Sequence, residues 1–158
     1  MEPGTIVNDV YSPVARPWSE ALSPLIPLRE RGIGKILVPT NFSQYSDTAL
    51  QLAIDLARQQ NARIHLLYVL RLRDPDNRVF HLMQEQIARS AGAKDIEIDP
   101  EIRKGKISEE ILNAEAEEKP DIIIMSRHRE GNSLLSLFRS ITAKVRKKAR
   151  CSVLVVGA

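Results

Sequence analysis

The sequence predicts an α/β fold of three layers, with a parallel, doubly wound sheet between two layers of helices. Short apolar runs recur along the chain, such as Ile36, Leu37 and Val38. Unbroken runs of this kind are typical of parallel strands that are buried on both faces. Between the runs, apolar residues recur at helical spacing, and strands that alternate with helices favour a parallel sheet.

Size and composition indicate one soluble, globular domain. The chain has 158 residues, of which 43% are hydrophobic and 27% charged. No apolar run approaches the ~20 residues that span a bilayer, and no secretory signal is evident at the N-terminus. The single cysteine, Cys151, excludes an internal disulfide and suits a reducing compartment. We therefore expect a cytoplasmic protein, or a cytosolic domain at the membrane if the chain is part of a transporter.

Residues 1–32 are expected to form an extended arm or linker, and residues 33–158 the domain. The arm holds five of the nine prolines and the only tryptophan, Trp18. Because proline lacks an amide donor and has a fixed φ, a regular helix or an inner strand is excluded there. The arm could lie against its own domain, contact a partner protein, or tether the domain to a parent membrane protein.

The pattern begins at Lys35, where the apolar run Ile36, Leu37 and Val38 is expected to form the first strand and a helix to follow it. Residues from Asn41 to Ser46 supply capping side chains, and apolar residues then recur at positions 49, 52, 53 and 56. A second strand is expected at residues 64–70. The next helix, at residues 79–90, is expected to place Phe80, Met83 and Ile87 on one face.

The alternation of Ile96, Ile98 and Ile102 predicts a third strand. Pro100 lies inside this strand, and proline is confined to strands at a sheet edge. Gly105 is expected to end the strand. Ser108 is then expected to cap the following helix, with Glu109 and Glu110 in its first turn, and Pro120 to close it.

The fourth and fifth strands are expected at residues 121–125 and 152–156. The helix between them carries one apolar stripe, formed by Leu134, Phe138, Ile141 and Val145. Eight basic residues lie between positions 126 and 150, against the single acid Glu130. They are typical of a solvated helix end, or alternatively of an anion site or a patch for an acidic partner.

Four segments resemble the universal stress protein family. Residues 35–43, K-I-L-V-P-T-N-F-S, are similar to the family's opening strand, K-I-L-V-P-x-D-x-S. Residues 102–112, I-R-K-G-K-I-S-E-E-I-L, are similar to its V-x-x-G-x-x-x-x-x-I-L segment. Residues 121–125 and 151–156 resemble its fourth and fifth strands. The resemblance covers roughly residues 34–157 in correct order and spacing.

The resemblance implies a Rossmann-like fold of the adenine nucleotide alpha hydrolase type. Its five parallel strands have the order 3-2-1-4-5, which agrees with the edge position expected from Pro100. A ligand crevice is expected between strands 1 and 4, where the strand order reverses. Candidate residues for a nucleotide or anion in this crevice are Pro39, Asn41, Val69, Met125, Ser126, Arg129, Arg139, Ser140 and Ile141.

The phosphate-binding loop of the family is altered in this sequence. Members that bind ATP resemble one another in the motif G-x2-G-x9-G-(S/T), and the corresponding residues here are Ser126, Arg129, Arg139 and Ser140. Only the last matches. Glycines let backbone amides approach phosphates closely, and side chains at these positions obstruct that approach. The acid of the first strand is replaced by Asn41, which brings no negative charge to a metal.

These changes predict a non-catalytic, stress-response binding or regulatory module with a degenerate nucleotide pocket and no cofactor. As an alternative, Arg129 and Arg139 could hold an anion or an adenine nucleotide, ATP included, with guanidinium groups in place of backbone amides. A slow ATPase ranks last, since it needs the missing glycines and acid. Output through protein contacts is expected in the first case, and ligand sensing in the second.

Neither a metal site nor nucleophilic catalysis is expected. The three histidines, at positions 65, 81 and 128, lack the i, i+4 spacing of a zinc helix, and His65 is expected to be a packed or an edge residue of the second strand. No G-x-S-x-G elbow is present. Cys151 is expected to be buried and inert.

The fifth strand also predicts a partner. Its residues Val153, Leu154, Val155 and Val156 are all apolar, and the family order places this strand at a sheet edge. An unprotected apolar edge invites pairing with another chain. Family members are similar in dimerising through this strand, so a homodimer through Ser152 to Val156 is expected. The net charge of +3 is too small to indicate nucleic-acid binding.

Overall fold

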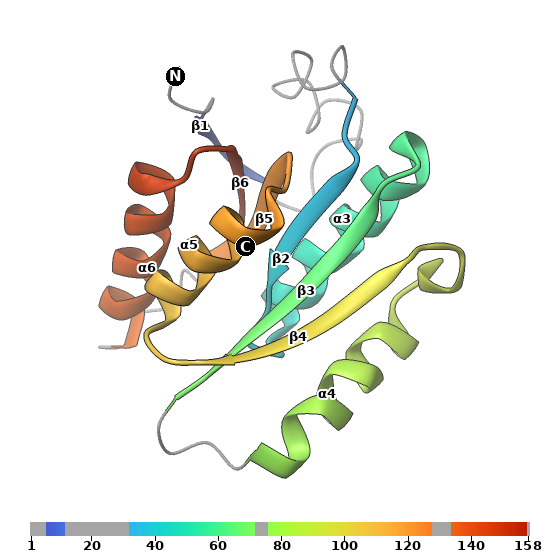
Figure 1. Ribbon diagram of the computed structural model, residues 1–158, viewed down its shortest axis with the longest axis horizontal. Coiled ribbons are helices and arrows are strands. Elements are labelled where there is room, and N and C mark those ends of the chain that lie inside the picture. The colour runs from blue at the N-terminus through green and yellow to red at the C-terminus, as the bar shows by residue number, and fades with distance from the viewer. Residues whose placement is uncertain (1–5, 12–31, 72–75, 128–133, 158) are drawn as a thin grey trace.

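The structure, a computed structural model, describes residues 6–11, 32–71, 76–127 and 134–157. Its strands are β1 (Ile6–Tyr11), β2 (Lys35–Pro39), β3 (Arg63–Leu70), β4 (Ile98–Lys104), β5 (Ile122–Arg127) and β6 (Ser152–Gly157). Its helices are α3 (Gln44–Gln60), α4 (Asp76–Arg89), the short 3₁₀ helix η2 (Ala93–Asp95), α5 (Ile107–Glu118) and α6 (Leu134–Lys148). Strands and helices alternate along the chain from β2 onward (Figure 1).

All strands of the sheet are parallel, in the order β1-β6-β5-β2-β3-β4. The part from β4 to β6 is the predicted five-stranded order 3-2-1-4-5, which is confirmed. The edge position expected from Pro100 is also confirmed, because β4 pairs only with β3.

The edge position expected for the fifth strand is wrong. β6 lies inside the sheet, since β1 pairs with its outer side and aligns Ile6 with Val153, Val7 with Leu154, and Tyr11 with Val156. The proline-rich arm therefore contributes a strand. The prolines excluded only an inner strand, and the six residues of β1 lie between Pro3 and Pro13 without containing a proline.

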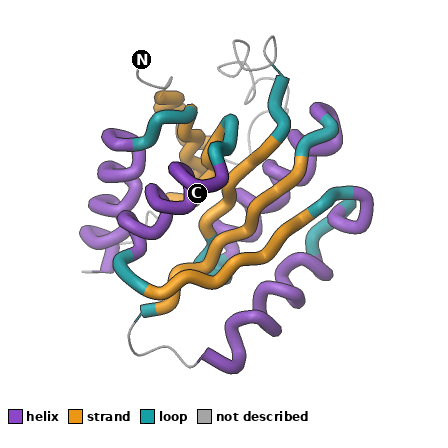
Figure 2. The backbone as a smooth tube through the Cα atoms, in the orientation of Figure 1, coloured by secondary structure: helices purple, strands orange, loops and turns teal. Residues whose placement is uncertain are grey.

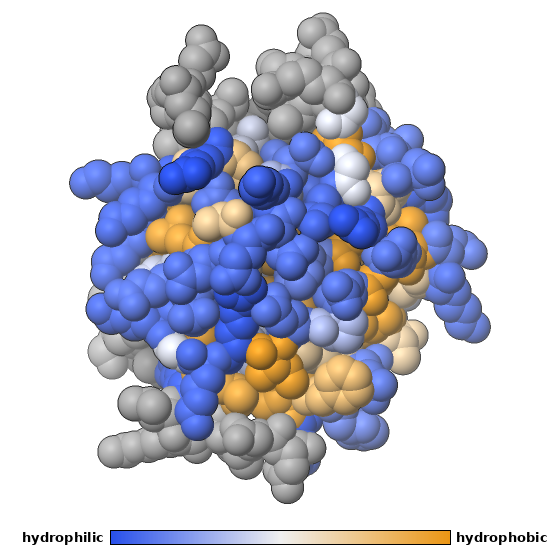
Figure 3. Space-filling view, viewed as in Figure 1, coloured by the Kyte–Doolittle hydropathy of each residue, from blue (hydrophilic) through white to orange (hydrophobic). Residues whose placement is uncertain are grey.

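The sheet is covered on both faces, as a parallel sheet requires. Helices α3 and α4 pack on one face, and α5 and α6 on the other (Figures 1 and 2). Successive residues of each strand alternate between the two cores, so that Val38 packs with α3 while Leu37 packs with α5 and α6. Hydrophilic residues cover most of the face seen in Figure 3.

Local capping signals predicted the start of α3 but not that of α5. Ser43 caps α3, where its Oγ accepts a hydrogen bond from the Ser46 amide at 3.2 Å. The prediction for α5 is wrong, because its N-cap is Lys106, whose backbone is extended, and Ser108 lies buried in the first turn. The expectation that Phe80 shares the buried face of α4 with Met83 is also wrong. Met83 is fully buried, but Phe80 is 48% exposed, since the buried side of α4 runs through Val79, Met83 and Gln86 instead.

Within the described ranges, no helix combines the length and apolar character that crossing a membrane requires.

Candidate functional site: the crevice between β2 and β5

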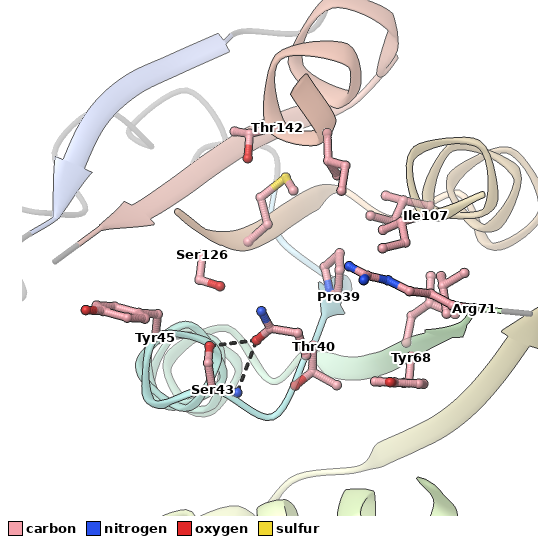
Figure 4. A pocket seen from close by; sticks show the side chains of 15 residues that line it. Pro39, Thr40, Ser43, Tyr45, Tyr68, Arg71, Ile107, Ser126 and Thr142 are labelled. Atoms are coloured by element: carbon pink, nitrogen blue, oxygen red, sulfur yellow. Dashed lines mark hydrogen bonds between the residues drawn. The ribbon is translucent and has the colours of Figure 1, made fainter. Parts of the chain in front are cut away.

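A crevice opens where the chain order of the strands reverses. β2 lies between β3 and β5, and the two chain segments that leave β2 and β5 run to opposite faces of the sheet, to α3 and α6. No connection therefore bridges the carboxyl ends of β2 and β5. The space between two such strand ends is the usual ligand position in sheets of this type. The cavity there has a volume of about 300 Å³ (Figure 4).

Fifteen side chains of the described residues line the crevice. The apolar group comes from the sheet and from α5 and α6: Pro39, Leu67, Val69, Ile107, Ile111, Met125 and Ile141. The polar or aromatic group comes mainly from the strand ends and the start of α3: Thr40, Asn41, Ser43, Tyr45, Tyr68, Arg71, Ser126 and Thr142. An apolar body with a few polar groups is the usual composition of a small-molecule site.

The structure brings six of the nine candidate residues together in this crevice. They are Pro39, Asn41, Val69, Met125, Ser126 and Ile141. Arg129 lies outside the described residues. Arg139 and Ser140 belong to α6, but the described side chains of this helix begin at Ile141. The arrangement of the altered phosphate loop is therefore outside the described part of the chain.

Sequence reasoning missed the remaining lining residues, although some carried a signal. Leu67 lies opposite Pro39 in the pairing of β2 with β3, and two residues before Val69, so strand alternation could have found it. Tyr45 and Arg71 had no periodic signal. Figure 4 shows Arg71 extending from the end of β3 toward the side where Pro39 and Ile107 lie.

Asn41 presents a hydrogen-bond donor to the crevice. Its Oδ1 accepts hydrogen bonds from the Ser43 amide at 3.1 Å and from the Ser43 hydroxyl at 2.6 Å (Figure 4). The carbonyl oxygen is thus engaged inside the loop. Among the described residues, the Nδ2 amide group has no partner, so its two N–H bonds are the part of Asn41 that a ligand could use.

A buried network holds the end of β2 beside α4. The Thr40 hydroxyl donates to Gln86 Oε1 at 2.8 Å, and Gln86 Nε2 donates to Asp47 Oδ1 at 2.7 Å. Arg89 pairs with the same Asp47 carboxylate. Gln86 is fully buried and Thr40 nearly so. The network therefore ties α4 to the loop that carries Asn41.

The loop makes a strained turn at Phe42, where φ is +63°. Residues with a side chain rarely adopt this left-handed conformation. The Phe42 ring stacks on the Tyr68 ring, with centroids 4.7 Å apart and planes 11° from parallel. The Phe42 amide donates to the Thr40 hydroxyl. These contacts offset the strain and fix the direction in which Asn41 leaves β2.

The described lining of the crevice contains a basic side chain and no acidic one. Arg71 is its one charged residue among the described lining side chains, which include no aspartate or glutamate. The N-terminus of α3 also lies at its rim, where Ser43 and Tyr45 line the cavity. A helix N-terminus has a partial positive charge. This described lining suits an anion, and none of its side chains offers a carboxylate to a divalent cation.

Other candidates from the sequence lie elsewhere. The basic residues near the end of α6, such as Lys144, Lys147 and Lys148, are exposed and do not line the crevice. Cys151 is half-buried, and burial, with a smaller effect of the Glu115 carboxylate, raises the pKa of its thiol to about 12. His65 is buried, as expected, and hydrogen-bonds Glu101 on β4. No three histidine, cysteine or acidic side chains gather as a metal site in the described ranges.

Residues 32–157 match the sequence model of the universal stress protein family. The chain belongs to this family. Among its relatives is the universal stress protein MJ0531 of Methanocaldococcus jannaschii, which is 26% identical over 77% of this chain and 81% of its own.

The fold of this universal stress protein domain recurs in solved structures. A universal stress protein in complex with cAMP superimposes with a TM-score of 0.64 at 20% identity, over 79% of this chain and 97% of that one. The universal stress protein of Archaeoglobus fulgidus in complex with dAMP gives 0.58 at 14% identity, over 78% and 96%.

Proposed function

We propose that this universal stress protein domain is a non-catalytic regulatory module, and that its crevice takes an adenine nucleoside monophosphate without a metal ion. One observation carries the proposal: an apolar cavity is rimmed by donors, Asn41 and Arg71 among them, and no acid is present among its described lining residues. The apolar walls suit a base and the donors suit a phosphate.

The relatives support a monophosphate as the ligand. Two proteins that share this fold hold cAMP and dAMP, and each of these ligands carries one phosphate. The cavity of about 300 Å³ lies at the lower end of the ~300–1,000 Å³ usual for ligand sites. A small nucleotide therefore fits the space better than a triphosphate.

The altered loop argues against ATP. Ser126 lines the crevice where ATP-binding members resemble one another in having glycine. The next two glycine positions hold Arg129 and Arg139. Mg²⁺ accompanies ATP and prefers carboxylate ligands, whereas Asn41 supplies an amide. Arg129 and Arg139 could instead add guanidinium donors for the single phosphate, as the sequence suggested.

The proposal of a non-catalytic module rests on the same side chains. The described lining residues include no histidine, cysteine, aspartate or glutamate, the usual general bases and nucleophiles. Ser126 therefore has no general base beside it within the described lining. Binding without turnover is the function that this set of side chains supports best.

Isothermal titration calorimetry tests the proposal directly. AMP, cAMP and ATP would each be titrated in EDTA and again in Mg²⁺, with UMP as the control for the base. We expect AMP or cAMP to bind one per chain in EDTA, and more tightly than ATP or UMP. Absence of heat with every adenine nucleotide at millimolar concentration would remove the proposal. Hydrolysis of ATP by the purified chain would contradict its non-catalytic part.

The second candidate is an inert crevice with output through protein contacts, favoured by the replacement of three of the four loop positions. Three contacts would then matter: a homodimer through Ser152 to Val156, a partner protein, or a parent membrane transporter bound through residues 1–32. Cytoplasmic location, or the cytosolic face of a membrane, belongs to the same proposal. In this structure β1 lies on the outer side of β6, so dimerisation there needs β1 to leave.

A further inference from the structure

The outer side of β6, which β1 covers, lacks the residues that usually protect the edge of a sheet from pairing with another chain. Its sequence from Ser152 to Gly157 contains no charged residue and no proline, the usual devices that protect an edge strand. If β1 were absent, the backbone N–H and C=O groups on this side would have no partner. This edge is therefore protected by its pairing with β1 and not by residues of β6 itself.

β1 is held differently from every other strand. Among the described elements it makes its substantial contacts with β6 alone, whereas each of the other strands packs against at least one helix. Its sequence, I-V-N-D-V-Y, places two polar residues at its centre, and the register shifts between Val7 and Tyr11. Within the described part of the chain, its attachment is therefore one short and irregular pairing with β6.

The chain between β1 and β2 is long enough for β1 to leave β6 and remain attached to the domain. β1 and β2 are three strand positions apart, or ~14 Å at ~4.8 Å per strand. Residues 12 to 34 separate them in the sequence, far more chain than this distance needs. Because β1 belongs to the same chain as β6, its pairing is intramolecular, with an effective concentration of up to about the millimolar range, and it competes with free chains at micromolar concentration.

We propose that β1 is a detachable cap on β6, and that the occupant that replaces it is β6 of a second copy of the chain. The proposal rests on the self-association considered above. A second copy is favoured because its β6 is equally uncharged, and a two-fold axis lets two identical edges complete each other. Release of β1 thereby converts a monomer into a dimer whose sheet is continuous across both chains.

The effect of the cap on assembly is quantitative. Both chains must release β1 before their β6 strands pair, so the dimer Kd rises by the factor (1 + K)², where K is the equilibrium constant for capping. A K of about 10 corresponds to ~1.4 kcal/mol. The cap would then raise the Kd about 100-fold relative to a chain without β1.

Sedimentation equilibrium from about 1 to 100 μM protein tests the proposal on four chains. They are the full chain, a truncated chain of residues 32–158, the full chain with Val7→Pro, and the full chain with Val14→Pro. The proline at position 7 removes an amide inside β1, and the proline at position 14 makes the same change outside it. We expect the truncated chain and Val7→Pro to dimerise with a Kd about 100-fold lower than the full chain and Val14→Pro.

Three results would overturn the proposal. The first is an equal dimer Kd for all four chains, and the second is that no chain dimerises. The third is a full-length dimer that truncation dissociates, which would mean that β1 of one copy pairs with the other copy. Circular dichroism checks that each chain is folded. If the truncated chain is unfolded, the comparison of Val7→Pro with Val14→Pro tests the proposal instead. AMP titration of the same chains separates this proposal from the first: β6 lies between β1 and the strands that border the crevice, so the affinity for AMP is expected to stay unchanged.

Discussion

The hydroxyl of Thr40, at the end of β2, donates a hydrogen bond of 2.8 Å to the side-chain carbonyl of Gln86 on α4. Both residues are buried, and Gln86 passes the connection on to Asp47 on α3. A side helix thereby holds the loop from which Asn41 reaches the crevice. The geometry of the candidate site depends on packing that lies behind the sheet, on the face away from α5 and α6.

Gln86→Ala should lower the free energy of unfolding by about 1–3 kcal/mol, because Thr40 and Asp47 lose a buried partner. The matched control is Gln84→Ala, at an exposed position of the same helix, where a change within about 0.5 kcal/mol is expected. Urea unfolding followed by circular dichroism measures both. Equal effects of the two substitutions would show that the network does not stabilise the fold.

Asn41→Asp should weaken AMP binding at least about tenfold in EDTA, since a donor becomes a negative charge beside the ligand phosphate. The fold should be unaffected, because a carboxylate oxygen can still accept both hydrogen bonds from Ser43. Asn113→Asp makes the same change on the exposed side of α5 and should leave binding unchanged. Calorimetry reports each affinity. Tighter AMP binding by Asn41→Asp without metal would contradict the donor role of Asn41.

Glu115→Ala should destabilise the domain by about 1–3 kcal/mol. The buried Glu115 carboxylate accepts hydrogen bonds from the backbone amides of Arg150 and Cys151, and so joins α5 to the start of β6. Glu115→Gln keeps one acceptor oxygen and should cost less. Glu109→Ala, on the exposed surface of the same helix, should cost less than about 1 kcal/mol. Thermal unfolding ranks the three variants, and a rank order with Glu109→Ala as the most harmful would refute this role.

The Cys151 thiol should make stability depend on pH in the alkaline range. Its pKa is raised in the folded state to about 12 from an ordinary value of 9.0. The folded state therefore holds the proton more tightly, and the stabilisation is complete below pH 9 and lost as pH rises from about 9 to about 12. The difference in unfolding free energy between the natural chain and Cys151→Ala should fall over this window. A constant difference would show that the thiol titrates normally.

Four of the five core strands could be predicted because each is an apolar run buried on both faces of the sheet, whereas the edge strand β4 was predicted from the alternation of its isoleucines. The position of β1 could not be predicted. Its sequence mixes Ile6 and Val7 with Asn8 and Asp9, and prolines flank it, so its strand conformation depends on the β6 edge that it covers. Local sequence carries no record of that distant pairing.

The same distinction holds at the site. Pro39, Val69 and Met125 were predictable because the fold places the carboxyl ends of their strands together. Tyr45 and Arg71 depend on the course of the chain beyond the strands, including the left-handed turn at Phe42. The start of α5 is another feature that the local sequence did not predict. Ser108 is a good capping residue, yet the N-cap of α5 is Lys106, two residues earlier, and the helix begins at Ile107.

A crystal structure of the chain grown with AMP in EDTA would show whether the crevice is a nucleotide site. We expect a nucleotide between β2 and β5, with its phosphate within hydrogen-bond distance of the Asn41 amide or the Arg71 guanidinium and with no metal beside it. An empty crevice at saturating AMP would contradict nucleotide binding at this site. A phosphate bound by backbone amides between residues 126 and 140, in the manner of the glycine loop that this chain lacks, would contradict the role of Asn41 and Arg71.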